Sequence, residues 1–173
     1  MDRNYTNHFT NTANPKANHT AYPEDPACRS ACEQDIHLAA RCRSRVLITA
    51  PPDRAVAVAR AIGAGARRTG GEAAVEVCDT AFCDAVSQLP ADTGTAILLL
   101  REVHAMSRSD QLALRRVLVE RASHYQTRIF ASSSVSLYDR VREGTFDDGL
   151  FYYLNTIHIV MPEVRSCGAT SES

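Results

Sequence analysis

The sequence has almost no lysine, no long apolar run and almost no net charge, and each absence excludes a class of function. Lys16 is the only lysine in 173 residues, so no later position can supply a phosphate-binding, Schiff-base or general-base lysine. The longest apolar run, Ala96 to Leu100, is far shorter than the roughly 20 residues that cross a bilayer, and the N-terminus has no signal-peptide core. A net charge of -1 gives no electrostatic footprint for nucleic acid. We therefore expect a cytoplasmic protein without direct DNA binding and without a membrane anchor.

Six cysteines raise the questions of disulfides and of metal. A disulfide scaffold is typical of much smaller secreted chains, so reduced thiols are expected. Cys28, Cys32, His37 and Cys42 have the elements of a Zn²⁺ site, but structural zinc sites usually pair two tight ligand couples and this spacing is loose. Unrelated surface residues are the favoured interpretation, and no metal site is predicted.

The two ends of the chain differ in composition from its middle. Residues 1–34 are rich in Asn, Thr and Pro and lack any periodicity, so they bury too little apolar surface to offset chain entropy. They are predicted to be a disordered arm, and residues 166–173 a similar tail. The middle, residues 35–165, has enough apolar material for one domain with one core.

Strands alternate with helices in that middle part. Alternation of this kind predicts an α/β fold with a parallel sheet and helices on both faces, in which ligands bind beyond the carboxyl ends of the strands. The carboxyl ends place residues 50–54, 101–102 and 132–134 at one edge. Strands are expected at 45–49, 73–78, 95–100, 127–131 and 156–160, and helices at 53–68, 80–87, 109–122, 135–142 and 148–154.

Four stretches of the middle part carry a family resemblance. They are "VLITA" followed by "VARAIG", then "REVHAMSRSDQLALRRVLVE", "RIFASSS" and "GTFDDGLFYYLNTIHIVMPEV". In order and spacing they resemble the AAA+ ATPase domain of sigma-54-dependent transcription activators, the bacterial enhancer-binding proteins. The second stretch follows the family motif D-E-I-x-x-L-x-x-x-x-Q-x-x-L-L-R-V-L-x-E, and the fourth follows G-x-F-R-E-D-L-Y-Y-R-L-N. The resemblance implies a three-layer AAA+, P-loop NTPase-like fold over residues 35–165, with ATP as the family's ligand.

The first stretch stands where the family has its glycine-rich phosphate loop. Ala55 takes the place of the family's lysine, and two prolines remove N–H donors from the turn, so the usual anion nest cannot form. Arg54 could still reach a phosphate, but a surface arginine in a tightened turn is favoured. The nucleotide-binding positions implied here are Ala50, Pro51, Pro52, Asp53, Arg54 and Ala55.

In the family, an Asp-Glu pair holds Mg²⁺ and polarises the attacking water. Arg101 and Glu102 stand at these positions here, so Glu102 is the only retained member of the pair. A guanidinium about 4 Å from Mg²⁺ would cost about 8 kcal/mol at an effective dielectric of 20, so both cannot occupy the site. Arg101 is expected either to pair with a phosphate or, as the favoured alternative, to form an ion pair with Glu102. Ser134 aligns with the family's γ-phosphate-sensing Asn, with shorter reach. A triad of a serine in 132–134, His104 and an aspartate lacks a nucleophile elbow and is not expected.

The fourth stretch resembles the family's subunit-facing segment. Asp147 and Tyr153 stand where the family has two subunit-bridging arginines, so the segment cannot complete a neighbour's site in the usual way. The family's G-A-F-T-G-A loop, helical lid and DNA-binding helix-turn-helix have no counterpart in this sequence. The subunit-interface positions implied are Phe146, Asp147, Leu150, Phe151, Tyr152 and Tyr153.

These replacements predict a truncated, degenerate member of the family, without catalytic residues and without a required cofactor. The expected role is a regulatory protein that modulates transcription through protein contacts, with an intact sigma-54 activator subunit or a second copy as partner. The alternative is a nucleotide-binding switch that uses Arg54 and Arg101 without Mg²⁺. A third possibility is a decaying fragment without function, which would fold poorly in isolation.

Overall fold

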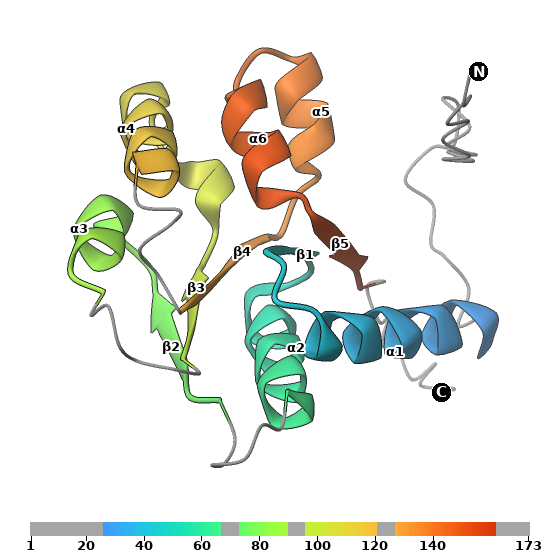
Figure 1. Ribbon diagram of the computed structural model, residues 1–173. Helices are drawn as coiled ribbons and strands as arrows, with labels where there is room; N and C mark the ends of the chain where they lie inside the picture. Colours follow the sequence, from blue (N-terminus) through green and yellow to red (C-terminus); the bar gives the residue numbers. More distant parts are fainter. Residues whose placement is uncertain (1–25, 67–72, 90–95, 121–126, 162–173) are drawn as a thin grey trace, which may run out of the picture.

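The computed structural model describes residues 26–66, 73–89, 96–120 and 127–161 (Figure 1). Strands and helices alternate along these residues, as the sequence predicts. The elements are α1 Pro26–Arg41, β1 Val46–Thr49, α2 Pro52–Gly65, β2 Val75–Cys78, α3 Phe82–Ser87, β3 Ile97–Leu100, the 3₁₀ turn η1 Val103–Ala105, α4 Arg108–Glu120, β4 Arg128–Ser133, α5 Leu137–Arg142, α6 Asp148–Leu154 and β5 Ile157–Val160.

The five strands form one sheet in the order β2-β3-β4-β1-β5, and every neighbouring pair is parallel. All four residues of β3 are buried, because this strand has a neighbour on each side and helices above and below. The continuous apolar run in the sequence therefore corresponds to an inner strand. The α/β class and the parallel sheet are confirmed.

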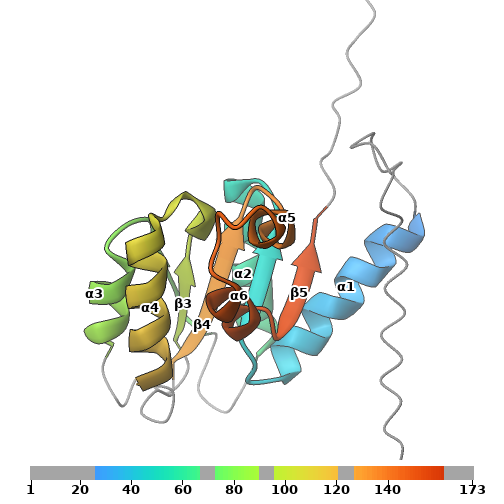
Figure 2. The ribbon, with the colours of Figure 1, turned by 90° about the horizontal axis from the view of Figure 1, so that it is seen from above.

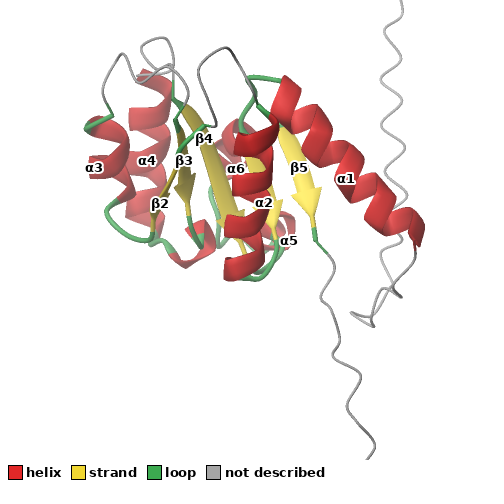
Figure 3. Ribbon diagram, turned by 90° about the horizontal axis from the view of Figure 1, so that it is seen from below, coloured by secondary structure: helices red, strands yellow, loops and turns green. Residues whose placement is uncertain are grey.

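Helices cover both faces of the sheet and make a three-layer fold. One face packs against α1 and α2, which lie in front of the sheet in Figure 3. The other face packs against α3, α4, α5 and α6, of which the last three lie in front in Figure 2. Each face has its own apolar cluster, so the sheet is the middle layer between two cores. No helix in the described ranges is long and apolar enough to span a membrane.

The helix α1 corrects the predicted extent of the disordered arm. The sequence places residues 26–34 in that arm, whereas the structure shows them as the first half of α1. The helix packs because it carries small buried residues, Cys32, Ala39 and Ala40, against α2 and β5. A stripe of small side chains gives only a weak periodic signal, so the sequence does not predict this helix. The rest of the arm, residues 1–25, and the tail, residues 166–173, lie outside the described residues.

Candidate functional site

The carboxyl ends of β1, β3 and β4 bring the predicted site residues to one edge of the sheet. The backbone N–H of Ala50, after β1, donates to the carbonyl of Ser133 in β4 at 3.1 Å. The N–H of Arg101, after β3, donates to the carbonyl of Cys78 in β2 at 2.8 Å. The turn, the residues Arg101 and Glu102, and Ser134 therefore lie at the same edge, as parallel topology requires.

The turn between β1 and α2 offers little to an anion. Pro51 precedes α2 in an extended conformation and Pro52 begins the helix, so two consecutive positions have no N–H group to donate. Asp53 adds a negative charge to the first helical turn, where it competes for the positive end of the helix dipole. Ala55, in the position of the family's lysine, is fully buried, and its N–H donates to the Pro51 carbonyl at 2.9 Å.

Arg101 forms its ion pair with Asp79, and the predicted pairing with Glu102 is wrong. Sheet register explains the difference. Cys78 in β2 is aligned with Leu100 in β3, so the next residues of the two parallel strands, Asp79 and Arg101, come side by side. The arginine is thus drawn toward the outer strand β2 and away from the centre of the edge.

Glu102 adopts a left-handed backbone conformation, with φ of 56°, that is uncommon for a residue with a side chain. Its Oε2 atom accepts a hydrogen bond from the Ser134 hydroxyl at 2.6 Å. Oε1 is buried and has no hydrogen-bond partner in the described part of the chain. Ser134, which aligns with the family's γ-phosphate sensor, thus donates its hydroxyl to Glu102 within the chain.

His104 lies next to the serine run but does not complete a catalytic triad. Its Nδ1 atom is 3.2 Å from the Ser133 hydroxyl and 3.6 Å from Glu102 Oε2. A relay needs one partner on each ring nitrogen, whereas both contacts here involve the same nitrogen. Ser133 is also fully buried and donates its proton to the Val135 carbonyl at 2.6 Å. The serine therefore has neither access to solvent nor a base in the right place.

The predicted subunit-interface segment is mostly internal, which is a second correction. Phe146, Asp147, Leu150 and Phe151 are buried in the chain's own core, because α6 packs on α4 and β4. Tyr153 is half-buried, and its hydroxyl donates to the Leu118 carbonyl at 2.7 Å.

Only Tyr152 of the six predicted interface residues is well exposed, at 72%. Its ring is edge-on to Phe151, with the centroids 5.4 Å apart, and Phe151 also contacts Tyr138 of α5 at 6.5 Å. Tyr138 is 53% exposed and was not predicted as an interface residue. The two tyrosines and the buried phenylalanine between them form what we call the aromatic edge, Tyr138, Phe151 and Tyr152.

The cysteines are spread over separate elements. Cys32, Cys42, Cys78 and Cys83 form no disulfide bond. Burial raises the pKa of the Cys78 and Cys83 thiols, which disfavours thiolate chemistry. No three His, Cys, Asp or Glu side chains in the described ranges come together as metal ligands. The side chain of Cys28 lies outside the described residues.

Residues 29–164 match the family model of the sigma-54 interaction domain. Among curated proteins, the regulatory protein AtoC of Escherichia coli (strain K12) is 40% identical over 84 residues, which cover 43% of this chain and 18% of the relative. The nitrogen fixation protein VnfA of Azotobacter vinelandii is 35% identical over 81 residues, covering 42% and 16%. The chain thus spans less than a fifth of the length of either relative.

Solved structures agree on the fold. NtrX from Brucella abortus, in complex with ATP, superposes with a TM-score of 0.57 at 22% identity, covering 85% of this chain and 38% of that one. The P-loop NTPase domain of the sigma-54 transport activator from E. coli gives a TM-score of 0.51 at 17% identity, covering 79% and 95%. At these identities the likeness concerns the arrangement of the sheet and helices.

Proposed function

The chain belongs to the sigma-54 interaction domain family, and from that premise we propose that it is a regulatory protein that acts through protein contacts instead of ATP hydrolysis. The scaffold of the family is retained, including the parallel sheet and both helical layers. What differs is the chemistry at the carboxyl edge of the sheet. A folded scaffold whose nucleotide chemistry has been replaced is suited to binding other proteins.

One observation supports the proposed loss of catalysis: both residues that stand in the place of the acidic pair already have partners within the chain. Arg101 is neutralised by Asp79, and Glu102 accepts the Ser134 hydroxyl. A carboxylate pair that binds Mg²⁺ must present free oxygen ligands, and a lysine or a nest of N–H groups must hold the phosphates. The turn at Pro51 and Pro52 supplies neither lysine nor nest.

The aromatic edge supports the second half of the proposal. Exposed tyrosines are favoured anchors in protein interfaces, because a large rigid ring is buried at a small entropic cost. The partner we propose is a subunit of an intact sigma-54 activator, and binding is expected to lower that activator's ATPase rate. A second copy of this chain is the competing partner.

A mixing experiment tests the proposal. The purified chain is titrated into an ATPase-competent member of the family while hydrolysis and particle mass are measured. We expect a dose-dependent fall in the rate, and we expect Tyr152→Ala to weaken the effect about tenfold or more, as for an interface hot spot. Val119→Ala, on the exposed side of α4, is the control, since it removes an exposed apolar group outside the aromatic edge. An unchanged rate and an unchanged mass at saturating chain would refute the proposal.

The alternative function is a nucleotide switch that uses Arg54 and Arg101 without Mg²⁺. The ion pair of Arg101 with Asp79 counts against it, because a phosphate would have to displace a carboxylate that is already in place. Calorimetric titration with ATP and ADP, with and without Mg²⁺, separates the two functions. Tighter binding in the absence of the metal would favour the switch, and no heat in any condition would remove it.

A further inference from the structure

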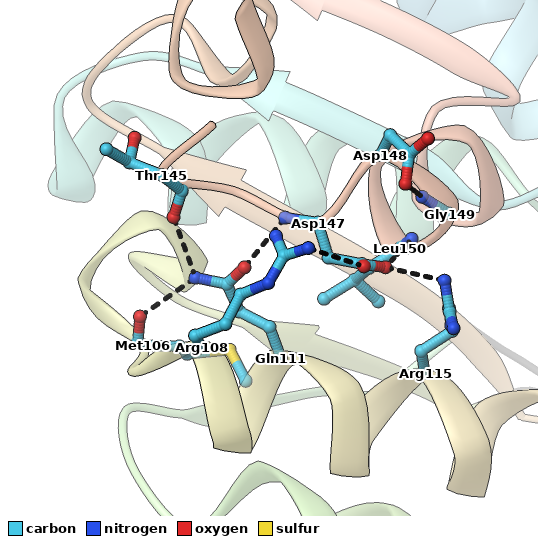
Figure 4. A network of polar contacts seen from close by, with 9 residues as sticks. All are labelled: Met106, Arg108, Gln111, Arg115, Thr145, Asp147, Asp148, Gly149 and Leu150. Atoms are coloured by element: carbon cyan, nitrogen blue, oxygen red, sulfur yellow. Dashed lines mark hydrogen bonds and ion pairs between the residues drawn. The ribbon is translucent and has the colours of Figure 1, made fainter. Parts of the chain in front are cut away.

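The junction between α4 and α6 contains a dense polar network around one buried carboxylate (Figure 4). The Asp147 side chain is 3% exposed. Its Oδ1 atom accepts the N–H of Leu150 at 2.8 Å, which caps the N-terminus of α6, and the Nη1 of Arg115 at 2.9 Å. Its Oδ2 atom faces the Nη2 of Arg108 at 3.4 Å. The aspartate that caps α6 thus holds two arginines of α4.

Gln111 of α4 fixes the backbone on the same side. Its side chain is buried, and its Oε1 accepts the N–H of Asp147 at 2.7 Å. Its Nε2 donates to the carbonyls of Met106 at 3.0 Å and Thr145 at 3.3 Å. The carbonyl and both N–H groups of this amide side chain are therefore used, and together they fix the backbone at Asp147 relative to α4.

Gly149 makes room for the Arg115 guanidinium. A Cβ atom on Gly149 would lie 2.2 Å from Nη1 and 3.1 Å from both Cδ and Cζ of Arg115. Nη1 is the far end of a flexible side chain, so a side chain at residue 149 would push the guanidinium out of its present position on Asp147. Arg115, Asp147 and Gly149 differ from the family motifs quoted above, which have leucine, arginine and aspartate at these positions.

We propose that Arg115, Asp147 and Gly149 form a conformational lock that holds α6 closed on α4. A positive group beside a helix N-terminus is normally unfavourable. Here the Asp147 carboxylate lies between the Arg115 guanidinium and the N-terminus of α6, and it attracts both of them. Seven residues are too few for α6 to persist as an isolated helix, so its stability must come from such tertiary contacts.

The lock determines the geometry of the aromatic edge. Tyr152 is on α6, and Tyr138 reaches α6 through Phe151, so an α6 that opened would separate the two exposed rings. At the other end of α6, the Tyr153 hydroxyl holds the Leu118 carbonyl of α4. With both ends fastened, the aromatic edge is kept in a single arrangement by contacts within the chain, and no bound ligand is required for it.

The steric exclusion between residue 149 and Arg115 gives a direct test by native-state hydrogen exchange of the full chain. We expect Gly149→Ala to raise the exchange rates of the α6 amides about tenfold, because the new methyl group displaces the guanidinium from Asp147. In an Arg115→Met background the same substitution should leave these rates unchanged or lower them, since alanine is the better helix former. Asp147→Asn, which keeps the cap but releases the arginine, should likewise make Gly149→Ala tolerated.

Arg116→Met is the matched control, since Arg116 is the exposed neighbour of Arg115 on α4. In that background Gly149→Ala should still raise exchange as it does in the wild type. Amides of β1 and β4 report in every variant whether the sheet remains folded. An equal effect of Gly149→Ala with and without the Arg115 guanidinium would overturn the lock, whatever the mixing experiment with an activator shows.

Discussion

Arg128 is expected to hold α1 on the sheet, and replacing it with methionine tests this directly. The residue begins β4, and its Nη2 donates to the carbonyl of Ala39 in α1 at 2.7 Å and to that of Ser44 at 3.3 Å. The guanidinium also lies over the Phe130 ring, 4.8 Å from its centroid. Burial lowers the pKa of Arg128, which indicates that some of the gain from these bonds is spent on desolvation.

The magnitude follows from the two hydrogen bonds. A hydrogen bond to a charged group contributes about 1.5–3 kcal/mol, and the longer one to Ser44 is weaker. Methionine keeps most of the apolar stem, so packing is largely preserved. Because the cost of desolvating the guanidinium offsets part of this gain, we expect Arg128→Met to lower the free energy of unfolding by about 2–3 kcal/mol. This corresponds to a fall of roughly 4–12 °C in melting temperature.

Urea unfolding followed by circular dichroism measures this loss, and limited proteolysis shows whether α1 is the part that is released. Arg43→Met is the control, because Arg43 is an exposed arginine in the same α1–β1 connection and should change stability by less than about 0.5 kcal/mol. A loss for Arg128→Met no larger than that of the control would refute the reasoning.

Two further predictions concern stability. Burial lowers the pKa of the His158 imidazole, although part of the residue is exposed, and its Nε2 is 2.9 Å from the Thr49 hydroxyl. The contribution of neutral His158 to the free energy of unfolding is complete above the unfolded-state pKa of about 6.5, and it is lost as the pH falls through the lower pKa of the folded state. In urea titrations at a series of pH values, His158→Gln should therefore reduce the loss of stability at acidic pH. Gly144 ends α5 with φ of 71° and would meet no atom with a Cβ, so Gly144→Ala should cost about 1 kcal/mol by backbone strain alone. Gly144→Asn should cost less in the same unfolding assay, and equal costs would contradict the backbone explanation.

Much of the fold could be predicted because its signals are local. The apolar run of β3 and the alternation of strands with helices depend on residues close together in the chain. The helix α1 could not be predicted, because its packing depends on small residues that meet α2 and β5 only in three dimensions.

The candidate site was predictable in location and not in pairing. Parallel topology alone places the turn, Arg101 and Ser134 at one edge. The choice of Asp79 over Glu102 as partner of Arg101 depends on the register between β2 and β3, which no single segment specifies. The burial of Asp147 depends on Arg115 and Gln111 of α4, which are far away in the sequence. A comparison of motifs does not include these contacts, so it predicts a subunit-interface position for a side chain that is buried within the chain.

The strand order has a consequence for how the chain folds. The inner strand β1 pairs with β4 and β5, both of which come much later in the sequence. Three of its four residues are fully buried, so until the last third of the chain has been synthesised they remain without either neighbour. Long-range parallel pairing of this kind makes folding slow and leaves an apolar strand open to aggregation in the meantime. Yield during expression should therefore depend more on temperature and chaperone supply than on the stability of the finished domain.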